Sequence, residues 1–203
     1  MAIRKVLAIV ATSIMIPMIG DGVAGAVDGT NQIVDTQQRT VRAVLFDTRI
    51  AAVPPLDGNP TTREWFHDGV VGFDISGPNA DSWKGKITIG YQVGYPAALT
   101  GRLKFGYKTP GLGVNLGGTG GPQFALTDLI PQGGIEAEVS IGPGIKEIAV
   151  ATGEISGASG QVRIAGVHGT VSGVVGPANI RPFVSVTTPT GDTVVAYGPI
   201  WSL

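Results

Sequence analysis

One stretch of eleven residues, TGRLKFGYKTP (100–110), alternates basic with apolar side chains. Its basic positions are Arg102, Lys104 and Lys108, and its apolar positions are Leu103, Phe105 and Tyr107. Successive side chains of a β-strand point to opposite faces, so a strand here has one cationic face and one apolar face. A cationic face acts on ions through its electrostatic field. An apolar face packs in a core or contacts lipid.

Side chains for covalent or metal chemistry are scarce elsewhere. His67 and His168 are the only histidines, there is no Cys, and neither histidine belongs to an HExxH or HxxxH pattern. We interpret both as structural residues. Asp68, Asp74 and Asp81 lack the dense spacing of a calcium loop, and we interpret them as solvated turn residues. Without a GxSxG elbow or a P-loop, the sequence predicts no enzyme, no metal and no cofactor.

The composition predicts an all-β protein. The chain has 203 residues, which suits one domain, or one domain plus an appendage. Its 32 glycines are spread among Val, Ile and Thr, a pattern typical of many short strands joined by turns. The formal net charge of −1 lacks the basic signature of a nucleic-acid-binding protein.

The N-terminal residues 1–26 have the pattern of a secretory signal peptide. Arg4 and Lys5 precede an apolar run at 6–19, and the small residues Ala-Gly-Ala at 24–26 fit a cleavage site. An uncleaved membrane helix is the alternative, but the apolar run is short and contains a proline. No later segment is apolar enough for a transmembrane helix. Strands of a membrane barrel need only about ten alternating residues, however, and escape such a search.

Strand-like patterns recur along the rest of the chain. The predicted strand regions are 40–50, 70–77, 84–95, 134–157, 160–175 and a final hairpin at 181–198. Residues 61–69 are expected to form a helical turn or a tight connection, and the polar segment from 27 to 39 has no predicted element. Closely spaced strands and turns favour a β-sandwich.

The segment 97–131 is predicted to be a long β-hairpin, because two strand-like arms flank a glycine-rich tip. It could be a surface hairpin with its apolar side chains in the core. Alternatively, it could contribute two strands to a membrane barrel. A basic residue facing the middle of the bilayer costs about 2–4 kcal/mol, so in a barrel the bases must face the lumen. One hairpin cannot close a barrel, and this second interpretation therefore requires an oligomer.

Seven motifs resemble those of the MspA-type porins of mycobacteria and related actinomycetes, in the same order and across nearly the whole mature chain. They are TTREWFH (61–67), GYQVGYP (90–96), FGYKTP (105–110), GPGIKE (142–147), HGTVSG (168–173), IRPF (180–183) and TGDTVVAYGPIW (190–201).

The resemblance implies an exported homo-oligomer, an octamer as in the founding member, that crosses the outer mycolate membrane. Residues 27–96 and 132–203 would form a β-sandwich rim domain, and the 97–131 hairpins would form the stem barrel. The implied activity is passive diffusion of ions and small hydrophilic solutes, without catalysis or cofactor. Tyr91 and Tyr95, with Phe105 and Tyr107, become candidates for interface and lipid contact.

The family's functional positions differ in this chain. Aspartates of the family constriction fall on Asn115 and Leu116, and a further acidic position falls on Gly118. Pore-lining positions that are small or neutral in the family carry Arg102, Lys104 and Lys108 here. Acidic residues of the vestibule correspond to Glu136 or Glu138, and to Glu154. Rings of one charge select against that charge, so we expect weak cation selectivity or anion selectivity.

Three alternatives stay open at this point. The chain could be a soluble secreted binding or adhesion module, or a small hydrolase, although no nucleophile–base pair supports the latter. It could also form mixed rings with an acidic paralogue. The face of the strand that Asp128 occupies is not determined, because apolar residues flank it at both parities.

Overall fold

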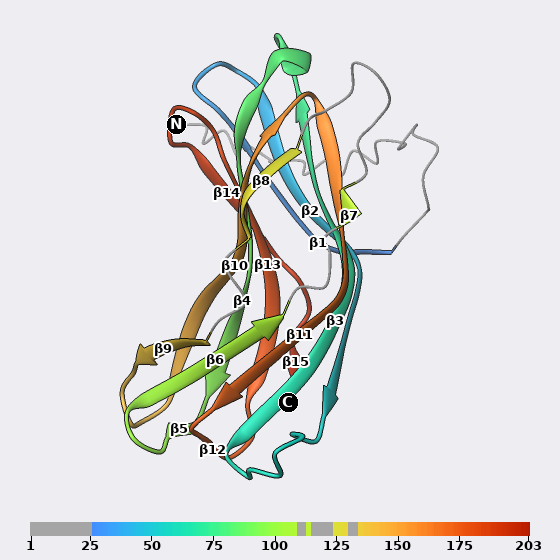
Figure 1. Cartoon of the computed structure of the whole chain (residues 1–203). Helices are drawn as coiled ribbons and strands as arrows, with labels where there is room; N and C mark the ends of the chain where they lie inside the picture. Colours follow the sequence, from blue (N-terminus) through green and yellow to red (C-terminus); the bar gives the residue numbers. More distant parts are fainter. Residues whose placement is uncertain (1–25, 109–112, 115–123, 130–133) are drawn as a thin grey trace, which may run out of the picture.

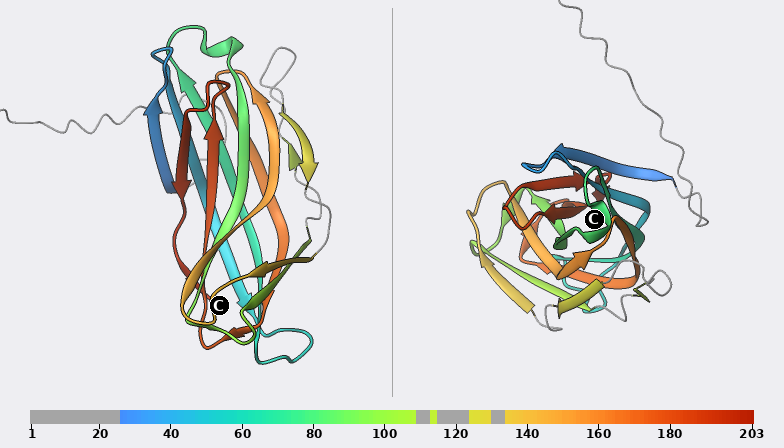
Figure 2. Two further views of the ribbon diagram at one scale, coloured as in Figure 1. Left: turned by 90° about the vertical axis from the view of Figure 1, so that its left-hand side faces the viewer. Right: turned by 90° about the horizontal axis from the view of Figure 1, so that it is seen from above.

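A computed structural model describes residues 26–108, 113–114, 124–129 and 134–203. In these ranges the chain forms β-strands and one short 3-10 helix, η1 (Ala80–Ser82), which confirms the predicted all-β class. Two sheets pack face to face, and a short β12–β5 pair lies at one end (Figures 1 and 2). No helix in the described ranges is long and apolar enough to cross a membrane. The predicted signal segment, apart from Ala26, lies outside the described residues.

In the described part of the chain, sheet A has seven strands in the order β1-β2-β3-β11-β6-β9, with β7 also paired to β11. Its strands are β1 (Val27–Val34), β2 (Thr40–Val53), β3 (Thr62–Ser76), β6 (Arg102–Lys108), β7 (Gly113–Val114), β9 (Gly134–Glu138) and β11 (Ser159–Ser172). All of its pairings are antiparallel.

Sheet B has six strands among the described residues, in the order β14-β13-β4-β10-β8, with β15 also paired to β13. Its strands are β4 (Lys84–Tyr95), β8 (Phe124–Leu129), β10 (Gly144–Ser156), β13 (Asn179–Thr187), β14 (Thr193–Tyr197) and β15 (Trp201–Ser202). The separate pair consists of β5 (Ala97–Ala98) and β12 (Val174–Val175).

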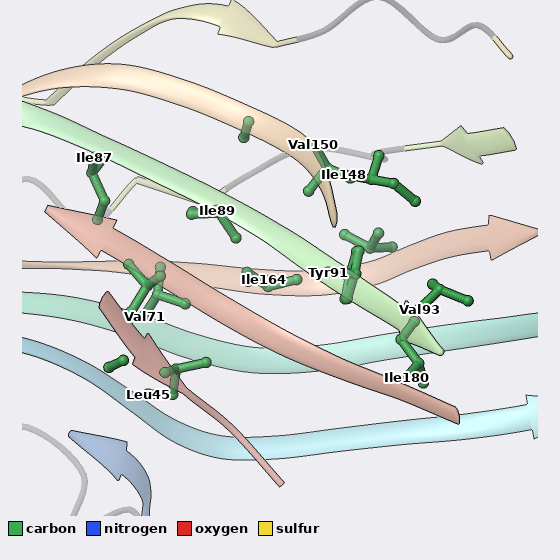
Figure 3. Close-up of a cluster of buried hydrophobic side chains, with 14 of the residues drawn as sticks. Leu45, Val71, Ile87, Ile89, Tyr91, Val93, Ile148, Val150, Ile164 and Ile180 are labelled. Carbon is green, nitrogen blue, oxygen red and sulfur yellow. The ribbon is translucent and has the colours of Figure 1, made fainter. Parts of the chain in front are cut away.

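The core lies between the sheets and follows from the two-residue repeat of their strands (Figure 3). On β4, Ile87, Ile89, Tyr91 and Val93 are buried, while the residues between them belong to the other face. Val71 and Ile164 of sheet A lie in the same buried cluster. The alternation in the sequence therefore translates directly into the packed interior.

The predicted helical turn or tight connection at residues 61–69 is wrong, because β3 runs through this segment. Trp65 and His67 are buried, whereas Phe66 and Asp68, which alternate with them, are exposed. This is the period of a strand. Pairing with β2 on one side and β11 on the other provides backbone partners that outweigh the local capping signal.

The sequence-based strands at 40–50, 70–77 and 84–95 and the final hairpin are confirmed. β1 was not predicted, because its residues are mostly polar. It exists because it pairs with β2 and also lies against β14. There the Asn31 side-chain amide donates a hydrogen bond to the Val195 carbonyl over 2.9 Å.

Candidate functional site

The basic strand β6 lies near one end of the sandwich, between β11 and β9 (Figure 1). It pairs with β11 from Lys104 to Lys108 and with β9 from Arg102 to Gly106. The expectation that this stretch forms a strand is therefore confirmed. Figure 2 shows the same segment obliquely across the end of the sandwich.

The two faces of β6 differ as the alternation predicts. Arg102 and Lys104 are exposed, whereas Leu103 and Phe105 are 0% and 2% exposed. The side chains of Tyr107 and Lys108 lie outside the described part of the chain, although their backbone belongs to β6.

Leu103 and Phe105 are buried in the single chain, whereas their expected lipid contact belongs to the assembled stem barrel and stays a prediction. Both belong to the sandwich core. The physical reason is that an apolar strand face without a membrane gains about 1.5–3 kcal/mol per large side chain by packing inward. Tyr91 and Tyr95, which lie outside the proposed stem, are also core residues, and for these two the expectation of interface or lipid contact is wrong.

The two arms of the predicted 97–131 hairpin are hydrogen-bonded to different sheets. β6 belongs to sheet A, whereas β8 pairs with β10 in sheet B, where Asp128 stands opposite Thr152. On the side away from β11, β6 pairs with β9, which begins beyond residue 131. The expected constriction residues Asn115, Leu116 and Gly118 lie outside the described residues.

An ion pair links β6 to β9. Arg102 Nη2 lies 3.5 Å from Glu138 Oε1, and both side chains are more than half exposed. In the same register, Lys104 stands opposite Glu136, whose side chain is outside the described part. Bases of one strand are thus matched with acids of the next, which is a favourable cross-strand arrangement.

The three candidate vestibule acids are not gathered at one place in this chain. Glu136 and Glu138 are on β9 in sheet A. Glu154 is an exposed residue of β10 in sheet B, where its register partners are Lys86 and Ala125. A common acidic rim would therefore have to be built by several subunits.

The two histidines occupy contrasting environments. His67 Nδ1 lies 2.6 Å from the Tyr91 hydroxyl in the core, and burial lowers the pKa of His67 to about 4. His168 is half-buried, with Nε2 located 2.8 Å from Glu64 Oε1 and its ring stacked on Phe66. Both contacts hold strands together, which agrees with the structural interpretation of these residues.

Two of the three aspartates considered for calcium have other partners. Asp68 and Asp74 lie within β3 rather than in turns, so that part of the prediction is wrong. Asp68 accepts a hydrogen bond from the Gly166 backbone N–H, and Asp74 lies 3.3 Å from Arg42. Among the described residues, no group of three or more His, Asp or Glu is arranged to hold a metal ion.

Reasoning from the sequence missed the role of β9 as the partner of β6. A signal was present in the charges of residues 97–138. The first arm carries only bases, the last part of the segment carries only carboxylates, and their numbers are equal at three each. These carboxylates are Asp128, Glu136 and Glu138. Such a separation by sign suggests facing strands of opposite charge.

Comparison with known proteins gives a consistent result. The family model described as MspA matches residues 37–202. Porin MspD of Mycolicibacterium smegmatis is 36% identical over 205 residues, covering 98% of this chain and 99% of the relative. Porin MspA of the same organism is 37% identical, covering 100% and 99%, and Porin MspC is 39% identical, covering 87% and 84%.

The fold and these matches define a class of all-β proteins with a two-sheet sandwich, in which the charged, amphipathic strand β6 lies next to the edge strand β9. Within that class, the chain belongs to the MspA family.

Proposed function

We propose that this chain is the subunit of an outer-membrane porin that lets ions and small hydrophilic solutes diffuse passively. The observation that carries the proposal is that relatives aligned over nearly the whole chain are porins by name. Their similarity includes the amphipathic segment, which has the alternating pattern that a barrel strand requires. An exported homo-oligomer, octameric in our proposal, would sit in the mycolate membrane.

The stem of this porin would be built from residues 97–131 of each subunit, and the rim from 27–96 and 132–203. Because β6 and β8 belong to different sheets in the single chain, assembly requires at least one of them to leave its present partner. Closing a ring removes the open strand edges that hydrocarbon does not tolerate. Membrane insertion and oligomerisation are therefore coupled steps in this proposal.

The lumen would carry bases where relatives of this family have neutral residues. Arg102, Lys104 and Lys108 share one parity of the strand, and a charged side chain on a lipid-facing position is costly. Asn115, Leu116 and Gly118 bring no carboxylate to the proposed constriction. We expect a channel with weak cation selectivity or with anion selectivity.

Recording in a planar lipid bilayer tests the function directly. Protein extracted with detergent should run as a heat-resistant oligomer and produce stepwise increases in conductance. Reversal potentials in a salt gradient then measure selectivity. A verified oligomer that stays electrically silent at high concentration would argue against the porin. A strong preference for potassium over chloride at neutral pH would argue against the basic lumen but not against the porin function.

A further inference from the structure

The residue Ala26 is hydrogen-bonded to the sandwich, although the sequence pattern assigns it to the signal peptide. Its backbone N–H donates to Asp47 Oδ1, and its carbonyl accepts from the Asp47 backbone N–H, each over 3.1 Å. Asp47 belongs to β2, which pairs with β1 from Val27 onward (Figure 1). Ala26 therefore continues the contact between the two strands by one residue and belongs to the folded domain.

The strand β2 is irregular where it contacts Ala26. The φ of Asp47 is 49°, in the left-handed region that residues other than glycine seldom adopt. The register of the β2–β3 pairing shifts at the same point. The next backbone N–H, that of Thr48, donates a hydrogen bond to the Asp28 carboxylate. Ala26 and Asp28 thus accept hydrogen bonds from two consecutive residues of this irregular segment and support its conformation.

The sequence permits the signal peptide to end at either of two positions. A signal peptide ends in small residues, and both Gly25 and Ala26 are small. Cleavage after Ala26 would remove the donor to the Asp47 carboxylate and the acceptor of the Asp47 N–H. Cleavage after Gly25 would keep both groups, and it would convert the amide nitrogen of Ala26 into an ammonium group beside a carboxylate.

We propose that the signal peptide is removed after Gly25, so that the mature chain begins at Ala26 and its ammonium group pairs with Asp47. The cleavage is a hydrolysis by a signal peptidase. Water adds across the Gly25–Ala26 peptide bond, the new carboxylate leaves with the signal peptide, and the new amine takes up a proton. The amide hydrogen bond to Asp47 then becomes a charge-assisted one, which is stronger. Processing thus completes a contact of the folded subunit.

The start of the mature chain can be measured directly. The full chain is expressed in a mycobacterial host, extracted with detergent and analysed by N-terminal sequencing and intact mass. We expect the sequence Ala-Val-Asp-Gly, which begins at position 26. A chain that begins Val-Asp-Gly, or one that keeps the signal peptide, would overturn the proposal. Neither result depends on whether the protein conducts ions.

Two substitutions test which small residue the peptidase requires. Ala26 is exposed in the folded chain, so a larger side chain fits there. We expect Ala26→Leu to be processed normally and to begin at position 26. Gly25→Leu should block cleavage at this bond, because the signal peptide would then end in a bulky residue. The opposite pattern, in which Ala26→Leu is blocked and Gly25→Leu is processed, would contradict the assignment.

The ion pair is tested by acetylating the α-amine of the mature chain near pH 7, where lysine amines remain protonated. Acetylation removes the charge but keeps an N–H donor. We expect it to lower the midpoint of urea unfolding of the wild-type monomer and to have no such effect on Asp47→Asn. The matched control is Asp57→Asn, because Asp57 is an exposed aspartate that also accepts a backbone hydrogen bond, from Asn59. Acetylation should act on this control as on the wild type, and an equal shift in Asp47→Asn would overturn the ion pair.

Discussion

Compared with the pairing of β3 and β11 at the centre of sheet A, the pairing of β6 with its neighbours is short. Within the described residues, β3 and β11 are matched at twelve positions, whereas β6 is matched with β11 at five and with β9 at five. The centre is held by a continuous buried face and many backbone partners. β6 also has buried side chains, but it has fewer backbone partners in each pairing. Its release therefore disrupts less of the sheet. The difference points to a stable rim and a segment that can change partners.

A crosslink between β6 and β11 should have the largest effect on the difference between the two regions. Phe105 and Val171 are direct register partners between β6 and β11. We expect an oxidised Phe105→Cys/Val171→Cys disulfide to abolish channel formation, because β6 can no longer leave the core. Reduction should restore stepwise conductance in bilayer recordings.

The control for this disulfide places a crosslink inside the rim. Ile89 and Val184 are register partners between β4 and β13. The oxidised Ile89→Cys/Val184→Cys protein should still form channels. If the oxidised Phe105→Cys/Val171→Cys protein forms channels as well as this control does, β6 keeps its pairing with β11 in the assembled pore.

Truncating core residues in the two regions should separate their roles. Ile164 of β11 and Leu103 of β6 are 2% and 0% exposed. We expect Ile164→Ala and Leu103→Ala each to lower the free energy of unfolding of the monomer by about 2–5 kcal/mol. Only Ile164→Ala should also weaken the rim of the assembled oligomer.

Urea unfolding of the monomer, followed by tryptophan fluorescence, measures the first effect. The midpoint of heat dissociation of the detergent-extracted oligomer measures the second. If Leu103→Ala and Ile164→Ala lower that midpoint equally, the distinction between the two regions does not hold.

The acid sensitivity of the stable centre should depend on His67. Its pKa in the folded chain is about 4, below the ordinary value of 6.5. As the pH falls from 6.5 towards 4, the unfolded chain therefore binds a proton that the folded chain does not bind. We expect the free energy of unfolding to decrease over this range by roughly 3 kcal/mol at most.

Urea titrations of the monomer at several pH values measure this slope. His67→Gln should remove most of it, whereas His168→Gln, at a half-buried site in sheet A, should retain it. A slope that persists in the His67→Gln protein would assign the acid sensitivity to other groups.

The smallest effect on stability is expected at the β6–β9 ion pair. Arg102 and Glu138 are largely exposed, and exposed pairs contribute about 0.2–1 kcal/mol. Arg102→Gln should therefore change the unfolding free energy of the monomer by less than about 1 kcal/mol in urea titrations. A loss of several kcal/mol would mean that this ion pair, rather than the buried apolar face of β6, holds the strand in the sheet.

Much of the fold could be predicted from the sequence, because most strands alternate in their own side chains. β4 and the final hairpin are examples, since Ile87 to Val93 and the turn at 190–192 carry local signals. β1 could not be predicted in this way. Its polar residues form a strand only because β2 and β14 lie beside it.

Only part of the candidate site could be predicted from the sequence, for a related reason. Alternation alone divided Arg102 and Lys104 from Leu103 and Phe105. Whether the apolar pair meets lipid or a core depends on what lies opposite, and local sequence does not encode that. The match of Arg102 with Glu138 is likewise a property of register between distant residues.

The position of β9 at the end of sheet A also affects aggregation. An exposed edge strand offers free backbone groups to other chains, and short, charged edges resist such pairing. β9 spans only Gly134–Glu138 and carries two glutamates, so like-charged copies repel one another when they approach edge to edge. We therefore expect the β9 edge of sheet A to resist pairing between free chains.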